Sequence, residues 1–231
     1  MSLAVRPGRL RRIVPESWVC RSVDTGVLLT FDDGPDPLQT QAVLERLAAY
    51  KVEALFFLVG QRISRAPHLL HRILAEGHEL GNHTETHPIL GWSDWSGPRH
   101  EIAVCQQRIA AETGVRPEWF RPPLGRLTPG VMSAAAREGL GVMNWSLDSG
   151  DWRCRSLEDA QRCAEETLAL VRPGDVVLFH DDHRYIGPIL DQILPELAHR
   201  GWLSRGAIPS RASSGSSSRV WARPVGAAPR A

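Results

Sequence analysis

Short apolar segments alternate along this chain with segments of helical periodicity, and this alternation limits the possible folds more than any other feature. Strands are predicted at 27–30, 54–59, 78–82, 142–147 and 175–179, and helices at 39–50, 68–76, 99–113, 128–138 and 189–199. The segment 54–59 is wholly apolar, as buried parallel strands tend to be. The alternation predicts an α/β fold with a parallel sheet, in an irregular TIM-like (β/α) barrel that forms a single domain.

The first predicted strand ends on two adjacent carboxylates. Asp32 and Asp33 follow the apolar residues 27–29 and precede Gly34 and Pro35. Asp, Gly and Pro also suit an ordinary turn for steric reasons, so the segment alone has two interpretations. Two like charges this close together need a neighbouring cation if both are to stay ionised. Partners elsewhere in the chain therefore decide between the two interpretations.

Other polar residues follow later strands, and the strand ends of a parallel barrel converge on one mouth. They are His83 and His87 after 78–82, Arg121 after Trp119 and Phe120, Asp148 and Asp151 after 142–147, and His180 after 175–179. The spacing of His83 and His87 would place both on one face of a helical turn, where they could bind a divalent metal. Such pairs are also frequent on surfaces, and this one lacks the glutamate of the HExxH protease motif.

Five segments occur in the same order as the motifs of a known family. They are TFDDGP at 30–35, HTETH at 83–87, RPPLG at 121–125, DSGDW at 148–152 and LFH at 178–180. Together they resemble the polysaccharide deacetylases, also called the NodB homology domain or carbohydrate esterase family 4, over about residues 20–202. The resemblance implies a metal-dependent hydrolase that removes N-acetyl groups from poly- or oligosaccharides containing N-acetylglucosamine, such as chitooligosaccharide or peptidoglycan.

The resemblance implies a metal site and a general base. Asp33, His83 and His87 are expected to bind a divalent metal, most commonly zinc, with Co2+, Ni2+ or Mn2+ as alternatives, and to leave positions open for ligands. Asp32 is expected to act as the general base. Arg121 is expected to hold Asp32 in place and keep it ionised, because a nearby cation favours the charged form.

The resemblance also implies a general acid and a substrate pocket. His180 is expected to protonate the leaving amine, with Asp148 orienting it and raising its pKa. The backbone amide of Leu124 is expected to bind the oxyanion, although the family often has an aromatic residue at that position. Trp152 and Leu178 are expected to line the pocket for the acetyl methyl group.

The sequence leaves the substrate and two other functions open. Trp92, Trp95 and Tyr185 are in predicted loops near the mouth and could stack on sugar rings or simply cover the barrel end. An O-acetyl esterase acting on xylan or another acetylated glycan could use the same metal site. A non-enzymatic metal- or glycan-binding domain is the other alternative, and the presence of both Asp32 and His180 disfavours it.

Composition separates the two chain ends from the predicted domain. Residues 1–19 are predicted to be an N-terminal extension, 20–203 the catalytic domain, and the Ser/Arg-rich segment 204–231 a disordered tail. This tail begins where the family normally has its last strand, which leaves open whether that strand is missing or altered. The sequence shows no apolar stretch of signal-peptide length, so we expect the protein to be located in the cytoplasm. The alternative location is the cell envelope or outside the cell, if the N-terminus is incomplete.

Charge and cysteine content exclude several classes of partner and site. The 27 basic and 26 acidic side chains nearly cancel, so we expect no nucleic-acid partner. The partner that the resemblance implies is an N-acetylated glycan substrate, and we expect a monomer. No segment approaches the roughly 20 apolar residues of a membrane span. The four cysteines form no CxxC pair and are predicted to be buried free thiols.

Overall fold

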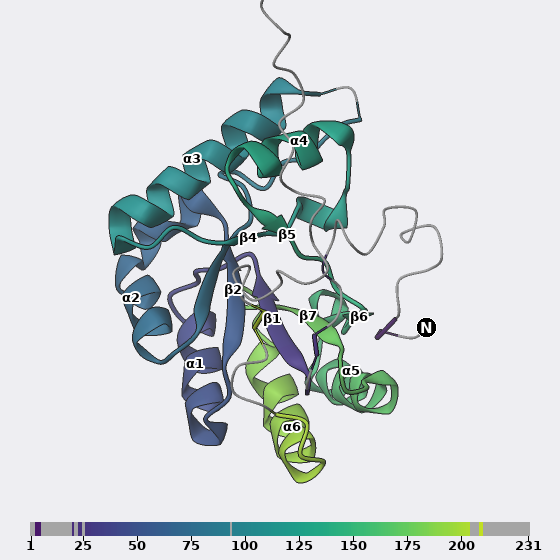
Figure 1. The fold of residues 1–231 in the computed structure, drawn as a ribbon. Coiled ribbons are helices and arrows are strands. Elements are labelled where there is room, and N and C mark those ends of the chain that lie inside the picture. The colour runs from purple at the N-terminus through teal and green to yellow at the C-terminus, as the bar shows by residue number, and fades with distance from the viewer. Residues whose placement is uncertain are drawn as a thin grey trace, which may run out of the picture.

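Parallel strands form an open barrel in the computed structural model, which describes residues 3–5, 20, 23–24, 26–92, 94–203 and 208–209. The strands are β1 (Leu28–Asp32), β2 (Ala54–Leu58), β3 (Glu79–Asn82), β4 (Trp119–Phe120), β5 (Gly141–Val142), β6 (Leu147–Asp148) and β7 (Val176–His180). Their order in the sheet is β5-β4-β3-β2-β1-β7-β6, so β5 and β6 are its edges (Figure 1). The predicted α/β fold with an irregular barrel is therefore confirmed.

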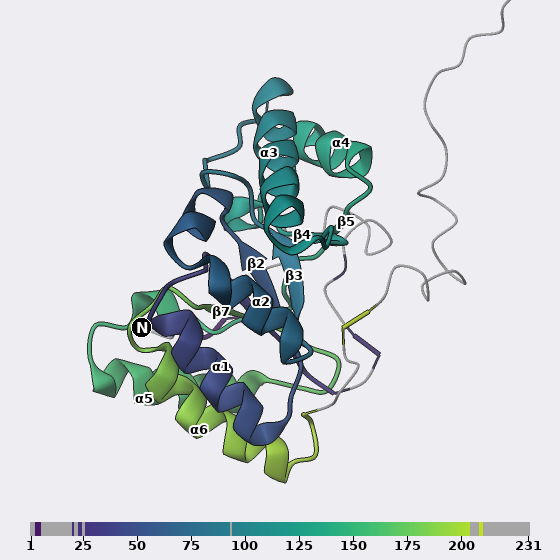
Figure 2. The same cartoon turned by 90° about the vertical axis from the view of Figure 1, so that its left-hand side faces the viewer.

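The helices surround the sheet in the order of the strands that they connect. They are α1 (Gln39–Tyr50), α2 (Pro67–Ala75), α3 (Ser96–Thr113), α4 (Pro129–Arg137), α5 (Leu157–Leu170) and α6 (Ile186–His199). Short 3₁₀ helices are η3 (Gly60–Arg65), η4 (Pro123–Gly125) and η5 (Asp151–Arg153). Contacts join α4, α3, α2, α1, α6 and α5 in that sequence. Figures 1 and 2 show α3 and α4 at one end of this ring and α1, α5 and α6 at the other.

Alternation along the strands separates the side that faces the helices from the barrel interior. Phe31 belongs to the main core, and its ring stacks on Phe56 and Phe179 with centroids 5.0 and 5.8 Å apart. Leu28 belongs instead to a second cluster, inside the barrel. Because side chains alternate with a period of two, Asp32 shares the interior side with Leu28. The strand pattern thus directs the Asp32 carboxylate inward.

One predicted strand and one helix differ from the sequence analysis. The strand predicted at 142–147 is two strands, because Val142 in β5 pairs with β4 while Leu147 in β6 pairs with β7 at the other edge. The chain between them crosses from one edge to the other. Helix α5 was not predicted, although Ser156 caps it by accepting a hydrogen bond from the backbone N of Asp159 at 3.1 Å.

Other helix boundaries lie within three residues of their predicted positions. α1 has its predicted bounds, whereas α3 and α6 each begin three residues earlier than predicted, at Ser96 and Ile186. Gly187 and Pro188 were predicted to precede α6 but lie in its first turn. Proline is tolerated there because the first backbone N–H groups of a helix have no partner within it.

The segments predicted to flank the domain lie mostly outside the described residues. Of those that are described, Leu3 is buried in the main core and Ile208 in the cluster inside the barrel. Trp119 Nε1 donates a hydrogen bond to the carbonyl of Pro209 at 3.0 Å. Within the described part of the chain, no helix is long and apolar enough to cross a membrane. All four cysteines are free, and all but Cys20 are buried, largely as predicted.

Candidate active site

The carboxylate of Asp32 is paired with a buried arginine. Asp32 ends β1, and its side chain is 4 % exposed. Arg121 directly follows β4, is fully buried, and donates from Nη1 to Asp32 Oδ1 at 2.7 Å. A buried ion pair is favourable only if its remaining donors are also satisfied. The structure thus joins the predicted base to its predicted anchor.

Three further N–H groups of Arg121 also donate hydrogen bonds. Nη1 donates to Thr30 Oγ1 at 2.8 Å, Nε to the carbonyl of Met143 at 3.1 Å, and Nη2 to the carbonyl of Asn144 at 3.4 Å. The guanidinium carbon lies 4.2 Å from the centroid of the Phe57 ring, which adds a cation–π contact. Burial lowers the pKa of Arg121 below its ordinary value despite the neighbouring carboxylate. The crossing between β5 and β6 therefore helps to fix the anchor of the base.

Asp33, His83 and His87 form a cluster of potential metal ligands beside Asp32. One ligand atom of each lies within 4.8 Å of the others. The Nε2 atoms of His83 and His87 lie 3.6 and 3.3 Å from Asp33 Oδ1. That oxygen is buried and has no hydrogen-bond partner among the described residues. Because an unpaired buried acceptor is costly, this donor set fits a divalent metal held by two imidazoles and a carboxylate.

The backbone brings His87 back to His83 without a helical turn. Residues 83–87 are not helical, and Thr84 and His87 have left-handed φ values of 71° and 56°. Thr84 supports this bend, because its N donates to Asn82 Oδ1 at 2.9 Å and its Oγ1 accepts from His87 N at 3.1 Å. The prediction that both histidines lie on one face of a helical turn is therefore wrong, although the two imidazole rings do meet, with centroids 4.9 Å apart.

A backbone carbonyl fixes the tautomer of His83. Its Nδ1 lies 2.6 Å from the carbonyl oxygen of Arg121. A carbonyl oxygen can only accept, so Nδ1 bears the proton and Nε2, which faces Asp33, keeps its lone pair. Burial lowers the pKa of His83, although Asp32 and Asp33 act in the opposite direction. A neutral imidazole is the form that binds a metal.

Asp33 has a left-handed backbone and lies among cationic groups. Its φ is 76°, and its carbonyl oxygen accepts a hydrogen bond from Arg62 Nη1 at 2.5 Å. The same nitrogen donates to Asp182 Oδ2 at 2.6 Å. Burial alone would raise the pKa of Asp33, but the histidines of the site and Arg62 hold it below its ordinary value. The sequence had offered no signal that Arg62 supports this loop.

His180 ends β7 and is paired with Asp151. Asp151 Oδ1 accepts from His180 Nδ1 at 2.8 Å, and Oδ2 accepts from the backbone N of His180 at 2.7 Å. Burial alone would lower the pKa of His180, but Asp151, with smaller contributions from Asp32 and Asp33, raises it to about 10. His180 is therefore protonated at neutral pH.

Asp148, the predicted partner of His180, has a different position. It ends β6, and its Oδ1 accepts a hydrogen bond from the backbone N of Gly150 at 2.9 Å. Gly150 has a left-handed φ of 73°, and the chain turns there so that Asp151 reaches His180. Burial raises the pKa of Asp148. The prediction that Asp148 orients His180 is wrong; the motif contained the correct aspartate, but its spacing did not show which one faces the histidine.

The residues predicted to contact the substrate differ in exposure. Leu124 in η4 is 52 % exposed and has a left-handed φ of 57°, and Trp152 in η5 is 48 % exposed. Leu178 is buried in β7, where it pairs in register with Asp148. Trp152 and Leu178 thus both lie beside the turn that holds Asp151. Their roles at the acetyl group, and that of the Leu124 amide, stay predictions.

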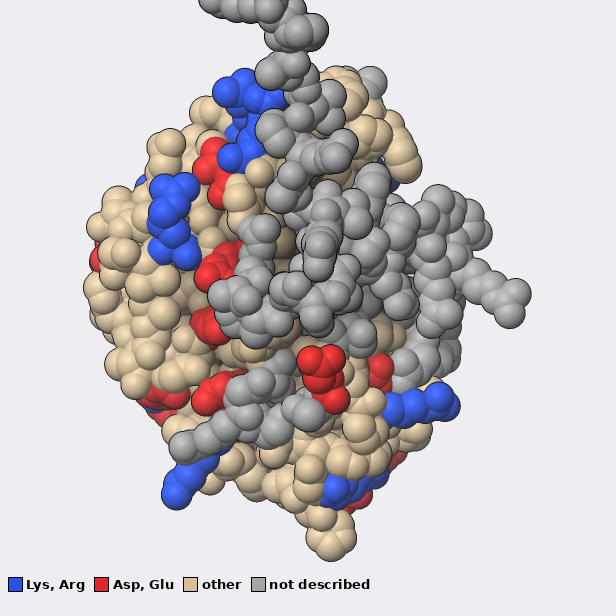
Figure 3. All heavy atoms as spheres, viewed as in Figure 1, with Lys and Arg blue, Asp and Glu red and all other residues tan. Residues whose placement is uncertain are grey.

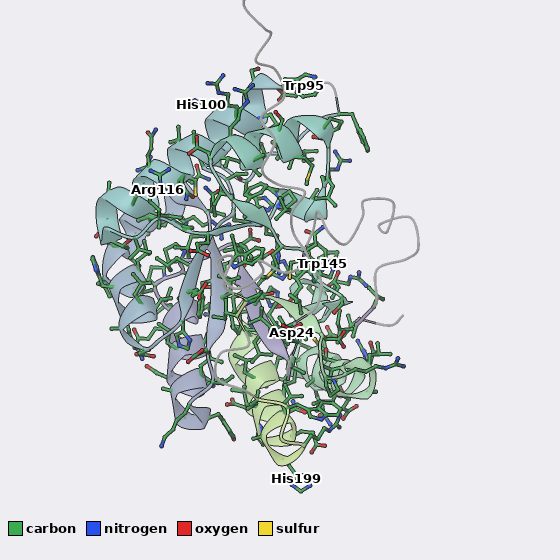
Figure 4. All side chains as sticks on the ribbon, viewed as in Figure 1. Asp24, Trp95, His100, Arg116, Trp145 and His199 are labelled. Carbon is green, nitrogen blue, oxygen red and sulfur yellow. The ribbon has the colours of Figure 1, made fainter. Side chains whose placement is uncertain are left out.

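The three aromatic residues considered for sugar stacking also differ in their exposure to solvent. Trp92 and Trp95 are 73 % and 60 % exposed, and Figure 4 shows Trp95 at the end of α3, near His100. Tyr185 is only 8 % exposed, belongs to the main core, and donates from its hydroxyl to the carbonyl of Arg155 at 2.6 Å. Tyr185 is therefore structural, and the interpretation that it stacks on sugars is wrong.

A buried aspartate behind the site was missed in the sequence. Asp181 is fully buried, its Oδ2 accepts a hydrogen bond from Thr40 Oγ1, and burial raises its pKa to about 8. Gly34 packs directly against it, since a Cβ at that position would lie 2.2 Å from Asp181 Oδ2. The absence of a side chain at Gly34 therefore allows the loop that follows Asp33 to approach Asp181.

The described residues on one face of the molecule carry charges of both signs. On the face shown in Figure 3, acidic and basic side chains are interspersed among uncharged residues. This agrees with a formal net charge of +1 for the whole chain. Electrostatic steering of a highly charged polymer is therefore not expected from this face.

Comparison with known proteins points to one family. The sequence profile of the family described as polysaccharide deacetylase matches residues 22–143. The chain is 38 % identical over 158 residues to a chitooligosaccharide deacetylase of Bradyrhizobium sp., covering 68 % of this chain and 71 % of that protein. It is 36 % identical over 192 residues to a peptidoglycan-N-acetylglucosamine deacetylase of Bacillus cereus, covering 80 % and 88 %.

A solved structure shows the same fold. The family 4 acetyl xylan esterase of Clostridium thermocellum, determined in complex with a cobalt ion, superposes with a TM-score of 0.69 at 32 % sequence identity. The match covers 76 % of this chain and 84 % of the esterase chain. The likeness therefore extends over most of both molecules.

Proposed function

The chain belongs to the polysaccharide deacetylase family, and from this premise we propose that it hydrolyses the N-acetyl groups of glycans that contain N-acetylglucosamine. One observation supports this most strongly: the ligand cluster lies beside a buried carboxylate–arginine pair, and a protonated histidine ends the adjacent strand. Asp32 and His180 are partners in the register of β1 and β7. Chitooligosaccharide and peptidoglycan are the proposed substrate classes, because two similar relatives are named for them.

We propose that Asp33, His83 and His87 hold a divalent metal, with zinc as the proposed ion. The metal, when bound, supplies a Lewis acid for the acetyl carbonyl and makes water a better nucleophile at neutral pH. The chain contributes two properties that suit such an ion. His83 presents an unprotonated Nε2, since its Nδ1–H is used by the carbonyl of Arg121. Asp33 presents a buried oxygen without a hydrogen-bond partner among the described residues.

Asp32 is the proposed general base. Arg121 occupies Oδ1, which leaves Oδ2 toward the ligand cluster, 3.7 Å from His83 Nε2. A water molecule that attacks the acetyl carbon must lose a proton, and a carboxylate held at this position can accept it. The buried guanidinium fixes the orientation of the base and keeps Oδ2 free for that proton.

His180 is the proposed general acid. Its Nδ1–H is used by Asp151, so Nε2–H is the proton available to the leaving nitrogen. An amine leaves only after protonation, whereas an alcohol leaves far more readily. A histidine whose pKa is raised to about 10 remains protonated at neutral pH and can supply this proton. This property favours an amide substrate over an ester.

Acetate release from defined substrates tests the proposal. Zinc-loaded protein would be incubated with chitooligosaccharides, peptidoglycan fragments and acetylated xylan, and acetate and free amine would be measured. We expect equal amounts of acetate and amine from an N-acetylated substrate, and a far lower rate of release by the Asp32→Asn variant. Acetate from xylan alone would support the O-acetyl esterase, which is the function named for the similar Clostridium thermocellum structure. A metal-loaded protein that releases no acetate would support a binding domain instead.

A further inference from the structure

The two edges of the open sheet are each paired with residues that precede β1. At β6, Val5 N donates to the carbonyl of Asp148 at 2.8 Å, and Asp148 N donates to the carbonyl of Val5 at 2.9 Å. At β5, Cys20 N donates to the carbonyl of Val142 at 2.9 Å, and Asn144 N donates to the carbonyl of Cys20 at 2.9 Å. The N-terminal part of the chain thus covers hydrogen-bonding groups that a sheet edge would otherwise expose.

Residues 3–5, here called the N-terminal strap, have a second attachment on α5. Glu166 Oε2 accepts hydrogen bonds from the backbone N of Leu3 at 2.5 Å and of Ala4 at 3.0 Å. Hydrogen bonds to an ionised carboxylate are stronger than those between neutral groups. Leu3 is buried in the same core as Leu147 of β6. The strap is therefore held by charge-assisted hydrogen bonds and by apolar packing.

The strap also touches the turn that presents Asp151. The carbonyl oxygen of Leu3 is packed against Gly150 so closely that a Cβ on this glycine would lie 2.0 Å from it. Arg153 Nη1 donates to the same oxygen at 3.5 Å. The strap thus contacts Asp148, Gly150 and Arg153, which flank Asp151 on both sides in the sequence.

Asp151 needs a fixed turn, because both of its carboxylate oxygens bind residue 180. Oδ1 accepts from the His180 ring and Oδ2 from the His180 backbone, at 2.8 and 2.7 Å. This two-point contact is lost if the turn shifts. We propose that the strap is a positioning element of the reaction: by holding Asp148 and Gly150, it keeps Asp151 on His180 and so keeps the general acid protonated and oriented. The proposal rests on the proposed function of His180.

Substitution of Glu166 tests the attachment on α5. In Glu166→Ala the strap loses its acceptor, and we expect kcat to fall about tenfold, because small misplacements of a reacting group are costly. KM and metal content should stay unchanged. In the pH profile of kcat/KM, the fall in activity at high pH (the alkaline limb), which reports the loss of the His180 proton, should move to lower pH. Glu166→Gln keeps an acceptor oxygen and should recover most of the activity. Glu165→Ala, at an exposed position of the same helix, is the matched control. A wild-type kcat with an unmoved limb in Glu166→Ala would overturn the proposal.

A second pair of variants tests the attachment on β6 and does not depend on Glu166. Val5→Pro removes the N–H that binds the Asp148 carbonyl, whereas Val5→Ala keeps it. Val5 is 37 % exposed, so neither substitution opens the core. We expect the effects of Glu166→Ala in Val5→Pro and wild-type behaviour in Val5→Ala. If Glu166→Ala fails to fold, this pair decides the question.

Amide hydrogen exchange separates failure of the strap from failure of the proposed function. It needs no substrate, and we expect faster exchange across residues 148–153 in Val5→Pro than in Val5→Ala. Unchanged exchange in these residues would overturn the proposal that the strap holds this turn, even if the enzyme is active. Faster exchange in Val5→Pro, together with no acetate release by the wild-type protein, would instead support the strap contact and reject the role of His180.

Discussion

The two halves of the candidate site are held by different parts of the molecule. The base and the predicted metal ligands follow β1 and β3, which are interior strands of the sheet, and Arg121 follows β4. The acid half depends on Asp151, which follows β6, a strand of two residues at the sheet edge. One half is thus fixed by the core, and the other by a turn and its local hydrogen bonds.

Because the two halves are held differently, we expect similar substitutions to have different consequences in each. Arg121 is fully buried, and removing its partner leaves a charge without compensation in the barrel interior. His180 retains 16 % of its side-chain exposure, so its environment can change without opening the core. Changes in the first half should abolish metal binding or turnover, whereas changes in the second should mainly alter the pH dependence.

The largest expected effect is the loss of the metal. The purified protein should hold about one divalent metal per chain, because neutral imidazoles and an ionised aspartate form the cluster. His83→Ala should reduce this to near zero and abolish acetate release. Elemental analysis measures the occupancy, and His100→Ala, exposed on α3 (Figure 4), is the control. Full occupancy in His83→Ala would show that the cluster is not the site.

Replacing the base should have the next largest effect. Asp32→Asn should keep the metal but lower kcat by roughly 10²–10⁴-fold, because an amide cannot accept the proton from water. The amide oxygen can still accept from Arg121, but the charge of this arginine loses its compensation, so thermal unfolding must show that the variant is folded when its rate is measured. Asp24→Asn, at an exposed position labelled in Figure 4, controls for the change of charge. A near wild-type rate would mean that the two aspartates have other roles.

The acid half should respond through its pH dependence. His180 has its pKa raised to about 10, so its protonated form is present below that value and is lost as the pH rises through it. Asp151→Asn removes the charge that raises this pKa, and the alkaline limb of kcat/KM should move to lower pH. Asp148→Asn keeps an acceptor for Gly150 N and should leave the limb in place.

Measuring kcat/KM against pH for Asp151→Asn and Asp148→Asn, at equal metal content, shows which aspartate raises the pKa of His180. A shift in Asp148→Asn alone would restore the partner predicted from the sequence. A bound cation at Asp33 would cancel part of that residue's contribution to His180, so the wild-type limb is expected at or below pH 10.

The smallest expected effect separates a structural aromatic residue from a substrate contact. Tyr185→Phe loses the hydrogen bond to the Arg155 carbonyl and should lower the free energy of unfolding by about 1 kcal/mol. Its KM for oligosaccharides should not change. Trp152→Ala should do the reverse, raising KM with little loss of stability, because Trp152 is 48 % exposed. A raised KM in Tyr185→Phe would reopen the stacking interpretation.

The sequence predicted the half of the site that depends on interior strands. Asp32, Asp33, His83, Arg121 and His180 all directly follow or end parallel strands, and such ends meet at one side of a sheet. No knowledge of turns was needed to bring them together. This is why the predicted base, its anchor and two of the three predicted metal ligands are found side by side, whereas His87 reaches them only through the left-handed bend at 84–87.

The sequence analysis failed where a turn decides the outcome or where buried helix positions hold small residues. Asp148 and Asp151 lie in one motif, and only the left-handed Gly150 determines which of them reaches His180. Helix α5 was missed although its buried positions have helical spacing, because these residues are small or weakly apolar: Ala160, Cys163, Ala164 and Thr167. The strand predicted at 142–147 looked continuous because its crossing segment is buried.

The attachment of the N-terminal strap has a consequence for biosynthesis. Leu3 is translated 163 positions before its partner Glu166. At about 5–20 residues per second, the strap waits roughly 10–30 s for that partner to be translated. Neighbouring strands such as β1 and β2 meet much sooner, because closing a short loop costs less entropy. The ligand cluster of the nascent enzyme can therefore form first, and its general acid is locked in place only after Glu166 and His180 have been translated.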